Sequence, residues 1–196
     1  MNKLFQKKQI FTIPNALSLF RIILIPLILY LYIAKSKYIL TIAVIAVSGL
    51  TDIIDGRIAR KYNMISDFGK ILDPIADKLT EGALMICLLE RYRLMWILLI
   101  LFAVWETVMV ILGGITVMRT GTVSSSLWFG KAATIVIYFN MAILILFPNI
   151  PQFGANSLII ICIIAVLNAF FLYTFYFWDR IEKAKEDKNR KEKRGE

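Results

Sequence analysis

The sequence predicts an all-α integral membrane protein with six transmembrane helices. Of its 196 residues, 59% are hydrophobic, which is more apolar side chain than a soluble domain of this size buries. Several apolar stretches approach the roughly 20 residues that a helix needs to cross a bilayer. The basic residues gather in alternate connecting segments, as they do in multi-pass membrane proteins. We therefore expect lipid, rather than water, to surround most of the chain.

Six spans are expected in chain order, and two of them carry charges. The predicted spans are 15–33, 38–58, 74–89, 94–117, 127–147 and 158–178. Hydropathy alone detects only four or five of them, because the second contains Asp52 and Asp55 and the third contains Asp77. No cleavage site of small residues follows the first span, so we expect it to be retained. The chain is predicted to be one membrane domain over 1–178 with a charged tail over 179–196.

The distribution of basic residues predicts that both termini are cytoplasmic. With six spans the termini share a side, and most lysines and arginines fall on that side. The opposite side carries only Lys35, Lys37, Arg91 and Arg93. The net charge of +9 suits anionic lipid headgroups better than nucleic acid, because the aromatic residues lie within the spans. We therefore expect a multi-pass protein of the cell membrane that contacts membrane lipids and no nucleic acid.

Four aspartates are concentrated in the second and third spans, although each costs about 2.5 to 3.5 kcal/mol at the centre of a membrane helix. Asp52 and Asp55 are three residues apart, and Asp73 and Asp77 are four apart, so each pair shares a helix face. A short polar turn between the helices predicts an antiparallel pair in which the carboxylates converge. Such close like charges need cations, and oxygen donors in a chain without histidine favour magnesium, manganese or calcium over zinc.

Small and basic residues beside the aspartates predict a phosphate site. Gly56 and Ala59 remove bulk from the aspartate face, either for a ligand or for close helix packing. Arg60 lies on the same face, where its guanidinium can bind phosphate. Divalent metal, phosphate and carboxylates together indicate phosphoryl transfer, with Asp77 as the base that accepts a hydroxyl proton.

The spacing Asp52-x2-Asp55-Gly56-x2-Ala59-Arg60-x8-Gly69-x3-Asp73-x3-Asp77 resembles the full signature of the CDP-alcohol phosphatidyltransferase family. The resemblance implies a six-helix enzyme, usually a homodimer, with a polar cavity open to the cytoplasm. It implies transfer of a phosphatidyl group from CDP-diacylglycerol to an alcohol with release of CMP, and Mg²⁺ or Mn²⁺ as cofactor. It also implies that Asp52, Asp55, Asp73 and Asp77 bind metal, that Asp77 is the base, and that Gly56, Ala59, Arg60, Ser66 and Gly69 surround the CDP-lipid.

Two flanking segments, 13–21 and 67–79, resemble the branch of phosphatidylglycerophosphate synthases and cardiolipin synthases. This resemblance implies glycerol 3-phosphate as the acceptor, with phosphatidylglycerol or an inositol phosphate as alternatives. Residues expected at the headgroup or acceptor cavity are Asn15, Ser18, Arg21, Glu106, Arg119 and Lys131. Asn15 and Ser18 equally suit the capping of the first helix, and Arg119 and Lys131 equally suit the anchoring of their loop.

The second half departs from the pattern typical of enzymes that use glycerol 3-phosphate. Trp105 stands where an arginine often precedes the glutamate, and Gly113 and Gly114 stand near the place of a second arginine. Ala133 replaces a frequent lysine. These differences keep phosphatidylglycerol open as the acceptor. An ion-coupled transporter is the alternative from another class, although the aspartates have no counterpart in the second half of the chain.

Overall fold

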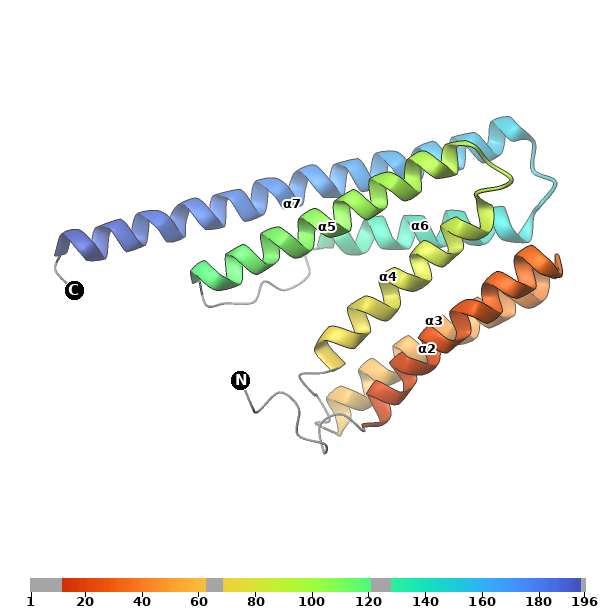
Figure 1. The fold of residues 1–196 in the computed structure, drawn as a ribbon, viewed down its shortest axis with the longest axis horizontal. Helices are drawn as coiled ribbons and strands as arrows, with labels where there is room; N and C mark the ends of the chain where they lie inside the picture. Colours follow the sequence, from red (N-terminus) through yellow and green to blue (C-terminus); the bar gives the residue numbers. More distant parts are fainter. Residues whose placement is uncertain (1–11, 63–68, 121–127, 195–196) are drawn as a thin grey trace. The chain divides into compact units, whose positions relative to one another are not determined.

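The computed structural model describes residues 12–62, 69–120 and 128–194, and it is helical throughout these ranges apart from short connections. The helices are α2 (Ile13–Leu29), the π-helical turn η1 (Tyr30–Ala34), α3 (Tyr38–Lys61), α4 (Gly69–Leu88), α5 (Leu94–Thr120), α6 (Trp128–Leu146) and α7 (Gln152–Arg194), all shown in Figure 1. No strand occurs in these ranges. The all-α prediction is therefore confirmed.

Five of these helices are long and apolar enough to cross a membrane. They include Ile13–Ala34, Tyr38–Ile58, Leu94–Met118, Trp128–Leu146 and Gln152–Lys183. The charged residues of α4, among them Asp73, Asp77 and Glu81, keep that helix below the hydropathy of a membrane span. The chain is thus an all-helical protein with five candidate spans in its described part, and the sixth span remains a prediction.

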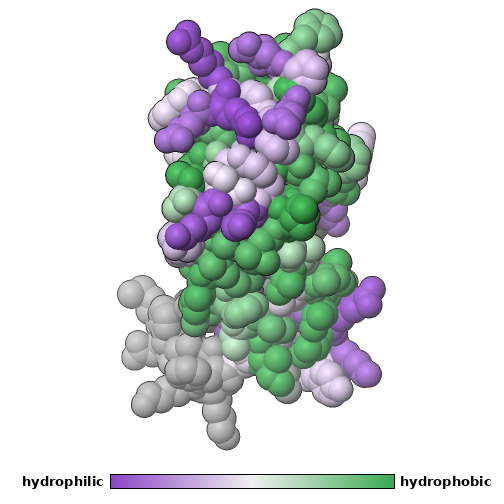
Figure 2. Space-filling view, turned by 90° about the vertical axis from the view of Figure 1, so that its right-hand side faces the viewer, coloured by the Kyte–Doolittle hydropathy of each residue, from purple (hydrophilic) through white to green (hydrophobic). Residues whose placement is uncertain are grey.

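Lipid-facing surface is visible on the described helices as exposed apolar side chains. Figure 2 shows hydrophobic (green) residues over much of the visible face, interrupted by groups of hydrophilic (purple) residues. Ile39 on α3, Val110 on α5 and Phe175 on α7 are 79%, 74% and 78% exposed. A water-soluble protein rarely exposes so many large apolar residues, so these faces suit a hydrocarbon solvent. This surface supports a multi-pass membrane protein.

The first compact unit contains α2, η1, α3 and α4, together with Met141–Ile150. α2 packs against both α3 and α4. It begins after Thr12, whose hydroxyl accepts a hydrogen bond from the backbone N–H of Asn15 at 3.4 Å. Thr12 is therefore the N-cap of this helix, whereas the sequence favoured Asn15 or Ser18 as capping residues. The buried residues of α2 begin with the adjacent Pro14 and Asn15 and then recur every three or four positions at Ser18, Arg21, Leu24 and Ile28.

The second compact unit contains α5, α7 and the first part of α6. α5 packs along α7. The buried side chains of α5 are spaced three or four residues apart, as at Leu98, Phe102 and Trp105, so they form one face of the helix. α7 continues without interruption to Arg194, so the charged tail after Trp178 is a helical extension of the last span.

Gly130 on α6 lies against Tyr173 on α7 within this second unit. A Cβ atom at position 130 would meet the Tyr173 hydroxyl and would lie 2.7 Å from its Cε2 atom. The Tyr173 ring is held in an edge-to-face contact with Phe129, with centroids 4.6 Å apart. We expect Gly130→Ala to cost about 1 to 3 kcal/mol of unfolding free energy through overpacking, seen as a lower thermal midpoint of the purified protein. Gly113→Ala, with nothing within 4 Å of the added atom, is the control, and equal midpoints for the two variants would contradict this expectation.

Candidate active site

Two helices of the first unit carry the four aspartates. Asp52 and Asp55 lie near the C-terminal end of α3, and Asp73 and Asp77 lie in the first turns of α4. The Asp55 side chain is only 4% exposed, whereas the side chains of Asp52, Asp73 and Asp77 are 46%, 42% and 41% exposed. Asp55 therefore forms the buried floor of the cluster, and the other three carboxylates remain accessible to a ligand.

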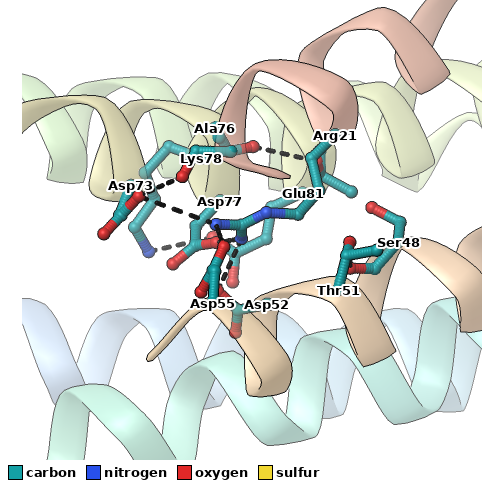
Figure 3. Close-up of polar contacts among 12 residues, drawn as sticks. Arg21, Ser48, Thr51, Asp52, Asp55, Asp73, Ala76, Asp77, Lys78 and Glu81 are labelled. Atoms are coloured by element: carbon teal, nitrogen blue, oxygen red, sulfur yellow. Dashed lines mark hydrogen bonds and ion pairs between the residues drawn. The ribbon is translucent and has the colours of Figure 1, made fainter. Parts of the chain in front are cut away.

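The guanidinium group of Arg21 on α2 lies among these four carboxylates (Figure 3). Its Nη1 atom is 2.6 Å from Asp52 Oδ1 and donates a hydrogen bond to Asp77 Oδ1. Its Nη2 atom donates to Asp55 Oδ2 at 3.1 Å and lies 4.0 Å from Asp73 Oδ1. The Arg21 side chain is 3% exposed. Because all four carboxylates approach one group, the convergence expected from their spacing is present in the structure.

Ser18, one helical turn before Arg21, also reaches the aspartate cluster. Its hydroxyl donates a hydrogen bond to Asp73 Oδ1 and contacts the carbonyl oxygen of Pro14 at 3.0 Å. Asn15 is buried on the same face of α2, at 4% exposure. The sequence predicted a cavity-lining role for these residues, and the structure places Ser18 and Arg21 in direct contact with the aspartates themselves.

A second ionic pair, for which the sequence pattern predicted no role, lies on α4 beyond the aspartates. Lys78 Nζ is 2.9 Å from Glu81 Oε2. The Glu81 side chain has no solvent exposure, whereas that of Lys78 is 32% exposed. Figure 3 shows this pair on the same helix as Asp73 and Asp77. The spacing in the sequence could have predicted the position of Glu81. Glu81 follows Asp77 by four residues and therefore falls on the same helix face.

The residues expected around the CDP-lipid are described only in part. Gly56 follows Asp55 on α3 and is half-buried, and Gly69 is buried at the start of α4. Ala59 and Arg60 belong to α3, but their side chains lie outside the described part of the structure, and Ser66 lies outside the described residues altogether.

The remaining predicted acceptor residues belong to the second unit. Glu106 is half-buried on α5, and Lys131 is exposed on α6. Arg119 lies at the end of α5, and its side chain is outside the described part of the chain. The aspartate cluster belongs to the first unit, so a role of these three residues at the same site remains a prediction.

The chemistry of the cluster suits a divalent cation. Four carboxylates and one guanidinium leave a formal charge of three negative units within a partly buried site, and carboxylate oxygens are the ligands that Mg²⁺ and Mn²⁺ prefer. Among the described residues, no group of three or more acidic, cysteine or histidine side chains is already arranged as a metal site. The contacts in this structure are instead directed at Arg21. The residue types of the cluster therefore suit a divalent ion, although their contacts in this structure are with Arg21.

The matches to known proteins agree with the signature in α3 and α4. A model of the CDP-alcohol phosphatidyltransferase family matches residues 11–177. A CDP-diacylglycerol–glycerol-3-phosphate 3-phosphatidyltransferase of Escherichia coli is 34% identical over 152 residues, which cover 71% of this chain and 80% of that protein. The enzyme of the same name from Rickettsia bellii is 43% identical over 81 residues, covering 40% of this chain and 45% of that relative.

A relative from the other half of the same branch also matches. A probable cardiolipin synthase (CMP-forming) of Drosophila melanogaster is 41% identical over 95 residues, covering 47% of this chain and 29% of that protein. The chain thus spans less than half the length of the Rickettsia relative and less than a third of the Drosophila one. The family model, in contrast, extends over all of the described helices except the end of α7. The chain belongs to the CDP-alcohol phosphatidyltransferase family.

Proposed function

We propose that this chain transfers the phosphatidyl group of CDP-diacylglycerol to glycerol 3-phosphate, giving phosphatidylglycerophosphate and CMP. The observation that supports this proposal most directly is the convergence of Asp52, Asp55, Asp73 and Asp77 on one point between α2, α3 and α4. The names of the E. coli and Rickettsia relatives support glycerol 3-phosphate as the acceptor. The product would enter phospholipid biosynthesis.

Asp77 is the proposed base. Its carboxylate is 41% exposed, so an acceptor hydroxyl can approach it. The hydroxyl oxygen forms a bond to the β-phosphorus of CDP-diacylglycerol, and the bond from that phosphorus to the oxygen bridging to CMP breaks. The hydroxyl proton passes to Asp77, and the departing CMP carries the electron pair of the broken bond. One direct displacement completes the transfer, without a covalent enzyme intermediate.

We assign the divalent metal, Mg²⁺ or Mn²⁺, to the carboxylates of Asp52, Asp55, Asp73 and Asp77. When bound, it would neutralise charge on the phosphates of the CDP-lipid. The three half-exposed carboxylates can reach both a metal ion and a substrate, and the buried Asp55 anchors the cluster between α2 and α3. Gly56, Ala59, Arg60, Ser66 and Gly69 are the proposed contacts of the CDP-lipid. The small size of the glycines beside Asp55 and at the start of α4 supports a close approach of the nucleotide to the backbone.

We further propose that α4 is the sixth membrane span and that the site opens to the cytoplasmic side of the cell membrane. The excess of basic residues near both termini supports a cytoplasmic location for both ends. Residues 1–178 would form the membrane domain and residues 179–196 the cytoplasmic tail. The half-exposed Asp52, Asp73 and Asp77 support a polar cavity there, and a homodimer is the proposed assembly.

Cardiolipin synthesis with phosphatidylglycerol as the acceptor is the second candidate. The Drosophila relative supports it, as do the second-half departures from the glycerol 3-phosphate pattern. Trp105, which stands where that pattern often has an arginine, is 3% exposed and packs edge-to-face on Phe102 within the second unit. The Trp105 side chain therefore packs inside the protein and brings no positive charge to this position. The proposed residues of the headgroup or acceptor cavity remain Asn15, Ser18, Arg21, Glu106, Arg119 and Lys131.

The test is an assay of CMP release from labelled CDP-diacylglycerol by the purified protein. Glycerol 3-phosphate, phosphatidylglycerol and inositol phosphate are supplied separately, each with magnesium and with a chelator. We expect release with glycerol 3-phosphate and magnesium only. Release only with phosphatidylglycerol would show that phosphatidylglycerol, and not glycerol 3-phosphate, is the acceptor. Turnover in the chelator would contradict the metal site, and no release with any of the three acceptors would show that the acceptor is another alcohol.

A further inference from the structure

We infer that Arg21 is an internal counter-ion of the aspartate cluster, which offsets part of the negative charge of the four carboxylates in the metal-free protein and is displaced from them when a divalent ion binds. This role rests on the metal site proposed above, and it concerns a residue of α2 that lies outside the aspartate signature.

The guanidinium of Arg21 contacts one oxygen of each of three aspartates that are proposed metal ligands. Its Nη1 contacts Oδ1 of Asp52 and of Asp77, and its Nη2 contacts Oδ2 of Asp55. A guanidinium has only donors, and each N–H bond occupies a carboxylate lone pair that would otherwise coordinate a cation. With a side chain only 3% exposed, Arg21 sits between the carboxylates and not at the rim of the site. The guanidinium and a divalent ion therefore compete for the same lone pairs.

The charges of the cluster lead to the same competition. Without a cation, carboxylates this close repel one another, and the Arg21 charge reduces that repulsion. A divalent ion placed among the same oxygens would lie a few ångströms from the guanidinium, where like charges in a partly buried site repel strongly. Arg21 therefore stabilises the metal-free cluster and weakens metal binding.

Ser18 provides a contrast on the same helix. Its hydroxyl is neutral and contacts one carboxylate, Asp73, so it can keep that side chain oriented while a cation is bound. Arg21 has a long, flexible side chain that can withdraw its charged end without movement of α2. When a cation binds, α2 can therefore lose the contacts of Arg21 with the aspartates and keep the contact of Ser18 with Asp73.

The experiment measures Mn²⁺ binding to the purified full chain in detergent, without CDP-lipid, from the electron paramagnetic resonance signal of free Mn²⁺. Arg21→Gln is compared with the unmodified protein and with Arg93→Gln, a matched control in the exposed turn between α4 and α5. We expect Arg21→Gln to bind Mn²⁺ about tenfold more tightly or better, because a nearby positive charge has been removed. We also expect its thermal midpoint to fall in chelator and to recover with Mn²⁺, with no such change for Arg93→Gln.

Equal or weaker Mn²⁺ binding by Arg21→Gln would overturn the counter-ion role while leaving the proposed metal site in place. No Mn²⁺ binding by any of the three proteins would overturn the metal site itself. If Arg21→Gln does not fold, the displacement of Arg21 is tested in the protein without substitutions. Its arginines are modified with phenylglyoxal, and the modified residues are identified by mass spectrometry. Mn²⁺ should increase modification of Arg21 and leave Arg93 unchanged, and an unchanged Arg21 would overturn the inference.

Discussion

Replacing Asp77 with asparagine is expected to lower the rate of CMP release by about 10²- to 10⁴-fold, the usual contribution of a positioned base. Asparagine keeps the size of the side chain and can still accept a hydrogen bond from Arg21, but it cannot take the proton of the acceptor hydroxyl. Binding of CDP-diacylglycerol should persist, because the remaining three carboxylates and the nucleotide contacts are intact. The measurements are initial rates at saturating substrates and equilibrium binding of labelled CDP-diacylglycerol.

The matched control for this variant is Asp179→Asn. Asp179 is half-exposed on α7 and forms an exposed helical ion pair with Lys183 at 2.7 Å, far along the chain from the cluster. Its replacement should leave the rate unchanged. Normal turnover by Asp77→Asn would show that another group is the base. Loss of lipid binding together with turnover would show that Asp77 acts mainly through the metal ion.

The predictable part of this fold is what local sequence determines. Apolar stretches and their lengths predicted the five helices that are candidate membrane spans. The three- and four-residue spacing of the aspartates placed each pair on one helix face. The predicted membrane span began at Pro74, whereas α4 begins at Gly69 and contains Pro74 in its interior. Asp73 lies in the same helix as Asp77, as their four-residue spacing predicted.

The contacts made by α2 could not be predicted in the same way. Spacing placed Ser18 and Arg21 on one face of a helix, but it does not say which other helix that face meets. Their contacts with the aspartates depend on the packing of α2 against both α3 and α4, which is a tertiary property. The pair of Lys78 and Glu81 was missed for a related reason: a charged residue in a poor hydropathy segment does not show whether it faces water or protein.

The Lys78 and Glu81 pair should respond unequally to removal of its two charges. Lys78→Met would leave the Glu81 carboxylate, which has no solvent exposure, without the ammonium 2.9 Å away. Leaving a charge in a buried site without its partner costs about 3 to 5 kcal/mol, and we expect a loss near the lower end of that range. Glu81→Gln should cost much less, because the partly exposed ammonium of Lys78 can turn toward water.

A double-mutant cycle measures this asymmetry through thermal midpoints in one detergent. The double variant Lys78→Met with Glu81→Gln should be more stable than Lys78→Met alone, because a neutral amide replaces the isolated charge. Equal losses for the two single variants, or a double variant whose loss is their sum, would show that the two charges do not stabilise each other. The expected order follows from burial, since of the two side chains Lys78 is 32% exposed and Glu81 has no solvent exposure. The pair lies within α4, so its expected effect is on the cost of burying the Glu81 carboxylate in this helix.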